Sequence, residues 1–178
     1  MQYTYKYQSP LGDMILASDG EALIGVWFVD KQRYYGDTMS GRQTEKELPI
    51  FSLTREWLDS YFRGAAPTFS PAIRFIGSPF RVAVWKILQQ IPYGEVITYN
   101  DIAKEIARQR GIAKMSAQAV GGAVGHNPVG IIVPCHRVVG TDGSLTGYGG
   151  GIDRKVKLLT LEHVNMERLY IPKKGTAL

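Results

Sequence analysis

The adjacent pair Cys135-His136 is the first feature of this 178-residue chain that could carry out chemistry. Cys135 is the only cysteine in the sequence. A thiolate is a strong nucleophile, and basic neighbours lower the pKa of a thiol so that more of it is ionised. A lone cysteine is more often a small buried apolar residue, so this alternative stands beside the reactive one.

Glu162 is a candidate carboxylate partner for this pair. It follows two leucines by three and four residues in the segment 153–163, which reads as a helix, so it should lie on that helix's apolar face. A buried carboxylate needs a partner, and His136 is a suitable one. We expect Glu162 to orient His136, and His136 to take the Cys135 proton directly or through water. The alternative is a carboxylate that reaches solvent at the helix edge.

The backbone around the cysteine can also be predicted. The apolar run 131–133 reads as a short buried strand, and Pro134 should end it because proline lacks a backbone N–H. Cys135 would then lie at the mouth of that strand. Asn127 precedes Pro128, which disfavours helical geometry. We expect its side chain to brace the turn before the strand, although a plain Asn-Pro turn fits equally well.

Two predicted helices with a turn between them precede this region, a plan common in DNA-binding proteins. Apolar residues recur at helical spacing from Tyr99 to Ala107, and Ser116 is a suitable N-cap for a second helix, 117–125. The inner stripe of the second helix is predicted as Ala117, Val120 and Val124. Its outer face is predicted as Gln118, Ala119, Gly122 and Gly125. Glycine weakens a helix by up to about 1 kcal/mol relative to alanine, so these small residues serve either tight packing inside the protein or close approach of another surface.

The remaining pattern predicts an α+β protein with two domains, residues 1–72 and 73–178. Alternating tyrosines near the N-terminus and the segments 14–17 and 23–29 read as an antiparallel meander. Residues 30–47 are polar and irregular. A helix is predicted over 48–63, followed by a proline-containing connection and a second helix start at Ser78-Pro79.

Charge divides the chain unevenly. The net charge is +5; residues 1–70 carry a balance of −2 and residues 71–178 a balance of +7. A basic half suits nucleic acid or another polyanion, although a modest excess can simply aid solubility. No apolar run approaches a membrane span, no signal pattern opens the chain, and a single cysteine fits a reducing cytoplasm. One cysteine and three histidines without zinc spacing predict no metal and no cofactor.

Three motifs carry a resemblance to a known family. The string PCHRV at 134–138, the Asn127-Pro128 pair and the run SLTGYGGG at 144–151 resemble the O6-alkylguanine-DNA alkyltransferases, repair proteins that move an alkyl group from guanine onto their own cysteine. The resemblance is detailed over 78–163 and faint before it, where a PLGDM hairpin is the main match. It implies an N-terminal RNase H-like domain. It also implies a mostly helical, winged helix-turn-helix-like C-terminal domain that carries the reactive cysteine.

The resemblance implies a stoichiometric, irreversible transfer of the alkyl group from O6-alkylguanine to Cys135, with O4-alkylthymine as an open second substrate. The expected partner is double-stranded DNA containing the lesion, and the expected protein is a cytoplasmic monomer. Some relatives hold a structural zinc in the N-terminal part. This chain has no cysteine or histidine there, so no metal is expected.

Individual roles also follow from the resemblance. Tyr148 and Gly149 form one wall of the pocket for the flipped base, and Val138 contributes backbone contacts to the base edge. Tyr99 lies at the mouth, where it aids rotation of the nucleotide and hydrogen-bonds the departing guanine, and Asn127 is a hinge. The residues expected to contact DNA are Gln118, Ala119, Gly122 and Thr141. Gln118 stands where the family has an arginine finger, a departure that bears on base extrusion rather than on the chemistry.

Two other functions compete with this one. A cysteine hydrolase could use Cys135, His136 and Glu162, but adjacent Cys and His seldom point at one another and no oxyanion-hole motif is apparent. A non-enzymatic binder of alkylated DNA is the second alternative. Such binders commonly carry tryptophan in place of the reactive cysteine, so the presence of Cys135 speaks against it.

Overall fold

The computed structural model describes residues 1–31 and 34–173, and the chain groups into two compact units. The first unit comprises Met1–Gly77 with Pro128–Ile132, and the second comprises Ser78–Asn127 with Val133–Leu178. The predicted division into residues 1–72 and 73–178 stays a prediction about domains. Within the described residues, no helix combines the length and apolar character needed to cross a membrane.

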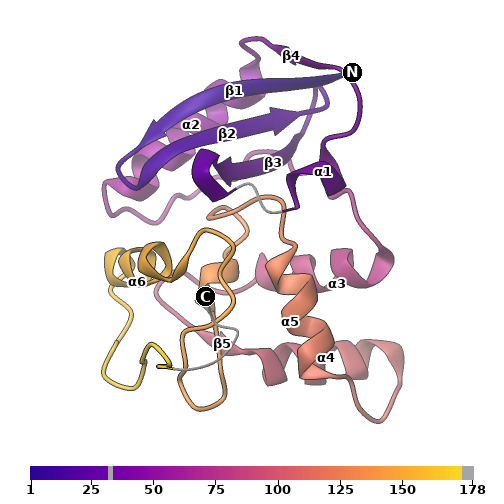
Figure 1. The fold of residues 1–178 in the computed structure, drawn as a ribbon, viewed down its shortest axis with the longest axis vertical. Coiled ribbons are helices and arrows are strands. Elements are labelled where there is room, and N and C mark those ends of the chain that lie inside the picture. The colour runs from indigo at the N-terminus through magenta and orange to yellow at the C-terminus, as the bar shows by residue number, and fades with distance from the viewer. Residues whose placement is uncertain (32–33, 174–178) are drawn as a thin grey trace. The chain divides into compact units, whose positions relative to one another are not determined.

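The first unit is built on a four-stranded sheet in the order β3-β2-β1-β4 (Figure 1). Its bounds are β1 (Gln2–Ser9), β2 (Gly12–Ser18), β3 (Leu23–Phe28) and β4 (Gln43–Glu45). The first three strands pair antiparallel, which confirms the predicted meander. The helix α2 (Pro49–Phe62) packs on the sheet, where Tyr7 donates its hydroxyl hydrogen to Asp59 Oδ1 at 2.7 Å and the rings of Tyr5 and Phe51 lie 5.8 Å apart.

The prediction that residues 30–47 are irregular was partly wrong. This stretch contains the 3-10 turn η1 (Val29–Lys31), the one-turn helix α1 (Tyr35–Thr38) and β4, which pairs parallel with β1. The ring of Tyr35 packs edge-on against Trp27 at 4.9 Å. Elements of three or four residues are too short to show a period in the sequence, so tertiary packing decides them.

Two separate chain segments cover the outer edge of β3. Residues 72–74 bond the amide and carbonyl of Leu23 at 2.8 and 2.9 Å. Residues 128–130 likewise hydrogen-bond the amide and the carbonyl of Val26, at 2.8 and 3.0 Å. An uncovered edge strand would expose unpaired N–H and C=O groups, so this pairing explains why Pro128–Ile132 belongs to the first unit.

The predicted strand at 131–133 is wrong. The chain turns there, with a hydrogen bond from Ile132 N to Gly130 O at 2.9 Å, and Ile131 adopts a positive φ of 69°. The run is apolar because all three side chains are buried, and burial alone does not distinguish a strand from a buried turn. Cys135 begins the 3-10 turn η2 (Cys135–Arg137) instead of ending a strand.

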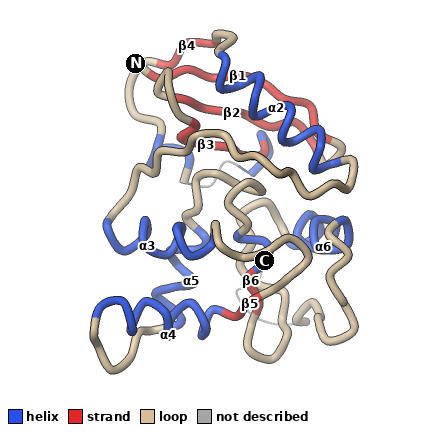
Figure 2. The backbone as a smooth tube through the Cα atoms, turned by 180° about the vertical axis from the view of Figure 1, so that it is seen from behind, coloured by secondary structure: helices blue, strands red, loops and turns tan. Residues whose placement is uncertain are grey.

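The second unit contains the predicted helix-turn-helix (Figure 2). Its helices are α3 (Pro79–Leu88), α4 (Tyr99–Arg110), α5 (Ala117–Gly125) and α6 (Ile152–Leu161). The α5 helix packs against both α3 and α4, and Trp85 of α3 donates its indole N–H to the Ala123 carbonyl of α5 at 2.8 Å. The predicted N-caps hold, because Ser78 and Ser116 accept hydrogen bonds from backbone amides three residues on.

Two short strands and an apolar cluster complete this unit. The strands β5 (Ile97–Thr98) and β6 (Val138–Val139) pair parallel, which places β6, directly after η2, beside the start of α4. Val139, Leu145, Leu159 and Val164 are all buried and pack together. This cluster packs β6, the following loop and α6 against one another, so it holds the chain segments that follow η2 in place.

Candidate active site

Cys135 is buried, with 8% of its surface exposed, at the start of η2. The Asn127 amide donates to Val133 O at 2.8 Å and also hydrogen-bonds the thiol, so it braces the turn that leads into η2. Burial raises the pKa of the Cys135 thiol, while the Asn127 contact and the charge of Lys155 act in the opposite direction. The expectation of a lowered thiol pKa is therefore not met, because desolvation outweighs the favourable neighbours.

His136 and Glu162 form the expected pair. The distance between His136 Nε2 and Glu162 Oε1 is 2.6 Å, and both side chains are fully buried. An ionised carboxylate only accepts hydrogen bonds, so Nε2 carries the hydrogen and Nδ1 is the nitrogen that can take up a proton. Glu162 also accepts from the Gly94 amide at 3.2 Å.

Arg137 is a third member of this cluster, which the sequence reasoning did not assign. Its Nε and Nη2 donate to the two Glu162 oxygens at 2.7 and 3.0 Å, and its Nη1 donates to Ile91 O at 2.6 Å. A bidentate arginine–carboxylate pair fixes the carboxylate plane, which then fixes the imidazole. The arginine within PCHRV was the available signal for this role.

The electrostatics of the cluster favour a neutral imidazole beside an ionised carboxylate. Burial alone would raise the pKa of Glu162, but hydrogen bonds from His136 and Arg137 outweigh it and lower the pKa to about 2. Burial lowers the pKa of His136, against the opposing effect of Glu162. Near neutral pH the imidazole is therefore uncharged and able to accept a proton.

Lys155 is the second charged residue that the sequence reasoning missed. It is fully buried in α6, and its ammonium donates to Val138 O at 2.5 Å and Thr146 O at 2.8 Å. Burial lowers the pKa of Lys155 to about 8, while the nearby Cys135 acts to raise it. Lys155 precedes Glu162 by seven residues, so the spacing that placed Glu162 on the inner face of this helix would also have found Lys155.

Two tyrosines flank the thiol. Tyr99, the first residue of α4, donates its hydroxyl hydrogen to Thr146 O at 2.9 Å, and burial raises its pKa to about 12. The Tyr148 ring lies edge-on to His136 at 6.3 Å, and burial raises its pKa well above the ordinary value. The proximity of Cys135 contributes to both shifts, so both tyrosine hydroxyls lie near the thiol.

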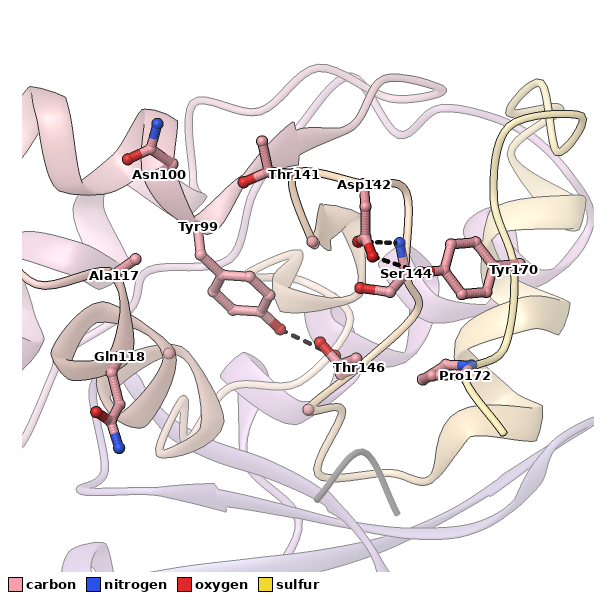
Figure 3. Close-up of a pocket in the computed structure, with 13 residues that line it drawn as sticks. Tyr99, Asn100, Ala117, Gln118, Thr141, Asp142, Ser144, Thr146, Tyr170 and Pro172 are labelled. Carbon is pink, nitrogen blue, oxygen red and sulfur yellow. Dashed lines mark hydrogen bonds between the residues drawn. The ribbon is translucent and has the colours of Figure 1, made fainter. Parts of the chain in front are cut away.

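A pocket of about 670 Å³ includes Tyr99 in its wall (Figure 3). Its lining includes Tyr99 and Gln118 on the helical side and Thr141 and Tyr170 on the other, whereas Cys135 does not line it. Figure 3 shows Tyr99 pointing across the pocket to Thr146. The Tyr99–Thr146 hydrogen bond is therefore part of the wall of this pocket, which we call the outer pocket.

The outer face of α5 is exposed at Gln118, Ala119 and Gly122, as expected. Ala117 is exposed as well, so its predicted place in the inner stripe is wrong; Ala123 is buried beside Val120 and Val124 instead. A Cβ added at Gly122 or Gly125 would meet no atom within 4 Å. Gly122 and Gly125 therefore have room beside them, whereas a Cβ at Gly121 would lie 3.8 Å from the Tyr99 ring.

The structure thus brings most of the predicted site residues together. Cys135 and six others are linked by hydrogen bonds, ring contacts or electrostatic proximity: His136, Glu162, Asn127, Tyr99, Val138 and Tyr148. Gly149 follows Tyr148 in the same loop and is exposed. Thr141 lies on the outer pocket, at a distance along the loop from the thiol.

Comparison with known proteins matches both parts of the chain. Residues 1–75 match the ribonuclease-like domain, and residues 79–164 the DNA-binding domain, of 6-O-methylguanine DNA methyltransferase. The methylated-DNA–protein-cysteine methyltransferase of Haemophilus influenzae is 40% identical over 165 residues, which span 92% of this chain and 87% of the relative. That of Mycolicibacterium paratuberculosis is 44% identical over 154 residues, or 86% and 88% of the two chains.

Solved structures agree. A crystal structure of Mycobacterium tuberculosis OGT in complex with DNA has a TM-score of 0.76 at 41% identity, covering 90% of this chain and 92% of that one. A crystal structure of Mycobacterium tuberculosis O6-methylguanine methyltransferase has a TM-score of 0.75 at 38% identity, over 98% and 97%. With both domain models matched in order and the thiol, imidazole and carboxylate assembled in one buried site, the chain belongs to the 6-O-methylguanine DNA methyltransferase family.

Proposed function

We propose that the protein repairs alkylated DNA by direct reversal, moving the alkyl group of O6-alkylguanine in double-stranded DNA irreversibly onto Cys135. The observation that carries this function is a thiol buried next to a His136–Glu162 pair in a chain of this family. Its curated relatives are named methylated-DNA–protein-cysteine methyltransferases. The protein is a DNA-binding methyltransferase that acts once per molecule.

The proposed reaction is a displacement at the alkyl carbon. His136 Nδ1 accepts the thiol proton, directly or through a water molecule, while Glu162 stabilises the imidazolium that forms. The sulfur bonds to the alkyl carbon as the bond between that carbon and O6 breaks. The electron pair stays on guanine, which takes up a proton and remains in the DNA as the normal base. Cys135 is left as a stable thioether, and because no step in the cycle returns it to the thiol, the protein is consumed.

The proposed reaction requires the alkylated guanine to rotate out of the duplex, because the thiol is buried and the guanine O6 lies within the base stack. The exposed small-residue face of α5 supports entry of that helix into the minor groove, since Gly122 and Gly125 leave space for the DNA backbone. Gln118 would then stand near the gap in the stack. We assign Ala119 and Thr141 to DNA contacts, and the wall of the base pocket to Tyr148, Gly149 and the Val138 backbone.

The resting state also supports a gated reaction. The raised thiol pKa keeps Cys135 protonated until His136 accepts the proton. A protonated thiol reacts slowly with other electrophiles, so a nucleophile that is used only once is protected. We further propose that the protein acts as a monomer without metal or cofactor, in the reducing cytoplasm where a free thiol persists.

Intact-protein mass spectrometry tests this function directly. Wild-type protein is incubated with duplex DNA containing one O6-methylguanine, with O4-methylthymine and undamaged duplexes in parallel. We expect a gain of one CH2 per molecule, located on Cys135 by peptide mapping, with the first duplex and none with undamaged DNA. An unmodified protein after prolonged incubation would exclude alkyl transfer, and a gain with O4-methylthymine would extend the substrate range.

A further inference from the structure

The loop formed by residues 140–147 is held at its outer edge by a C-terminal segment, residues 168–172. The Leu145 amide donates to Tyr170 O at 2.8 Å, and the Tyr170 amide donates to Gly143 O at 3.2 Å. The two stretches pair like neighbouring parallel strands. The approach is close at Gly143, which has a φ of +88° and where an added Cβ would lie 2.0 Å from Arg168 O.

A side-chain contact closes the same edge. The Tyr170 hydroxyl donates to Asp142 Oδ2, while the other oxygen of Asp142 accepts from the Ser144 amide at 3.0 Å. One carboxylate therefore shapes the turn of the loop and binds the C-terminal segment. Tyr170 and Pro172 also line the outer pocket, so the segment supplies part of the pocket wall (Figure 3).

The inner end of the loop contacts Tyr99 and Lys155, two residues that lie near Cys135. Thr146 O accepts from both Tyr99 and Lys155, and a Cβ added to Gly147 would lie 3.0 Å from the Tyr99 hydroxyl. Tyr148 follows directly and packs against His136. The loop and the residue that follows it therefore contact Tyr99, Lys155 and His136, and Cys135, which adjoins His136 in the chain, is only 8% exposed.

The two ends of the loop differ in how easily they release. If an incoming nucleobase accepts the hydrogen bond of the Tyr99 hydroxyl, Thr146 O loses that donor but keeps the Lys155 ammonium. The Thr146 carbonyl is therefore not left without a partner. The inner end therefore stays anchored to the buried Lys155 ammonium when Tyr99 changes its partner. The outer edge, where the exposed Tyr170 bonds Asp142, is the end that can move away and open the loop.

We infer that Asp142 and Tyr170 are positioning residues that hold the 140–147 loop closed over Cys135 and shape the pocket that receives the nucleotide. The role in nucleotide binding rests on the proposed function, whereas the closure itself does not. Loss of the contact should expose the thiol and weaken binding of damaged DNA. The chemical step should be unaffected, because neither residue contacts the Cys135, His136 or Glu162 side chains.

The first test measures closure without DNA. Because the chain has one cysteine, the rate of labelling by iodoacetamide reports access to Cys135 alone. We expect Tyr170→Phe to label about threefold faster or more, and Asp142→Ala at least as fast, because it also removes the acceptor of the Ser144 amide. The double variant should label no faster than Asp142→Ala, because the Tyr170–Asp142 bond is already lost in that single variant. Tyr35→Phe is the matched control, since it removes a comparable hydroxyl bond, to Gln43 at 2.7 Å, in the other unit.

The second test uses single-turnover repair of an O6-methylguanine duplex at rising DNA concentration. We expect the half-saturating concentration to rise severalfold in both single variants, and the limiting rate to stay near the wild-type value. Unchanged labelling in both singles would overturn the inference, as would a lowered limiting rate with unchanged half-saturation. If wild-type protein takes up no methyl group, the proposed function fails, yet faster labelling would still support closure by Tyr170 and Asp142.

Discussion

The buried charged cluster around Glu162 and the exposed face of α5 belong to the same unit, yet they differ in nearly every physical property. In the cluster, His136, Arg137, Lys155 and Glu162 are each less than a tenth exposed, and hydrogen bonds of 2.5–3.0 Å join them to one another or to carbonyls. The α5 face carries small uncharged residues, two of which have open space around them.

In the function that we propose, the two regions have different tasks. A proton relay needs groups held in one geometry, and buried charges that satisfy one another supply it at the cost of desolvation. A helix that approaches DNA closely needs little side-chain volume, and charge can be placed around it instead. Substitutions in the cluster should therefore change chemistry and folding together, whereas substitutions on the exposed face of α5 should change only the binding and extrusion steps on DNA.

Cys135→Ala should give the largest effect and separate the two regions most clearly. It removes the nucleophile, so methyl transfer should be abolished, while affinity for DNA should stay within about twofold because most contacts are made elsewhere. Radiolabelled methyl transfer and a binding titration on the same preparation measure both. Residual transfer to the protein would mean that another side chain is the acceptor.

Glu162→Gln should slow transfer by about 10²-fold, because an amide does not stabilise the imidazolium that forms on His136. Wild-type His136 has a lowered pKa and stays neutral, so its relay should work at neutral pH even though burial raises the thiol pKa. Without the carboxylate, the rise of the pH–rate profile should move to higher pH.

The matched control for this variant is Glu167→Gln, an exposed carboxylate in the same unit. Because the Glu162→Gln substitution also leaves Arg137 without its counter-charge, the melting temperature of each variant is measured beside the rate. A well-folded Glu162→Gln protein with the wild-type rate and pH–rate profile would remove Glu162 from the relay.

Salt should weaken DNA binding but not the chemical step. Residues 71–178 carry a balance of +7, so affinity for undamaged duplex should fall by roughly tenfold or more between 50 and 200 mM salt as phosphate contacts release counterions. The limiting rate at saturating DNA should change little, because the cluster is shielded from solvent. A binding constant that does not depend on salt would contradict a basic DNA-binding face.

Gln118→Arg should give the smallest change in rate, but it is the most specific test of the exposed face of α5. Gln118 is exposed at the start of the helix, where a longer planar cation would fill the gap left by an extruded base better than a neutral amide. We expect repair of duplex DNA to speed up by about three- to tenfold, with little change for free O6-benzylguanine, which needs no extrusion. Equal effects on both substrates would show that Gln118 does not limit extrusion.

The amino-acid sequence by itself determined the elements whose signals are local. The N-caps at Ser78 and Ser116, the helical period after Tyr99 and the alternation in the first strands all predicted the observed elements. The helical spacing of Glu162 also predicted its burial against a partner, because one helical face must pack inward wherever the helix docks.

Tertiary structure decided the features that depend on residues distant in the sequence. The turn at 131–133 exists because its neighbours pair with Val26, and the partners of Arg137 and Lys155 come from other elements. The thiol pKa is raised rather than lowered because burial of Cys135 in the folded protein removes water, an effect that adjacent residues do not reveal. Burial and charge pairing are properties of the folded surroundings, so sequence spacing predicts which side chains face inward but not the free energy of their charged states.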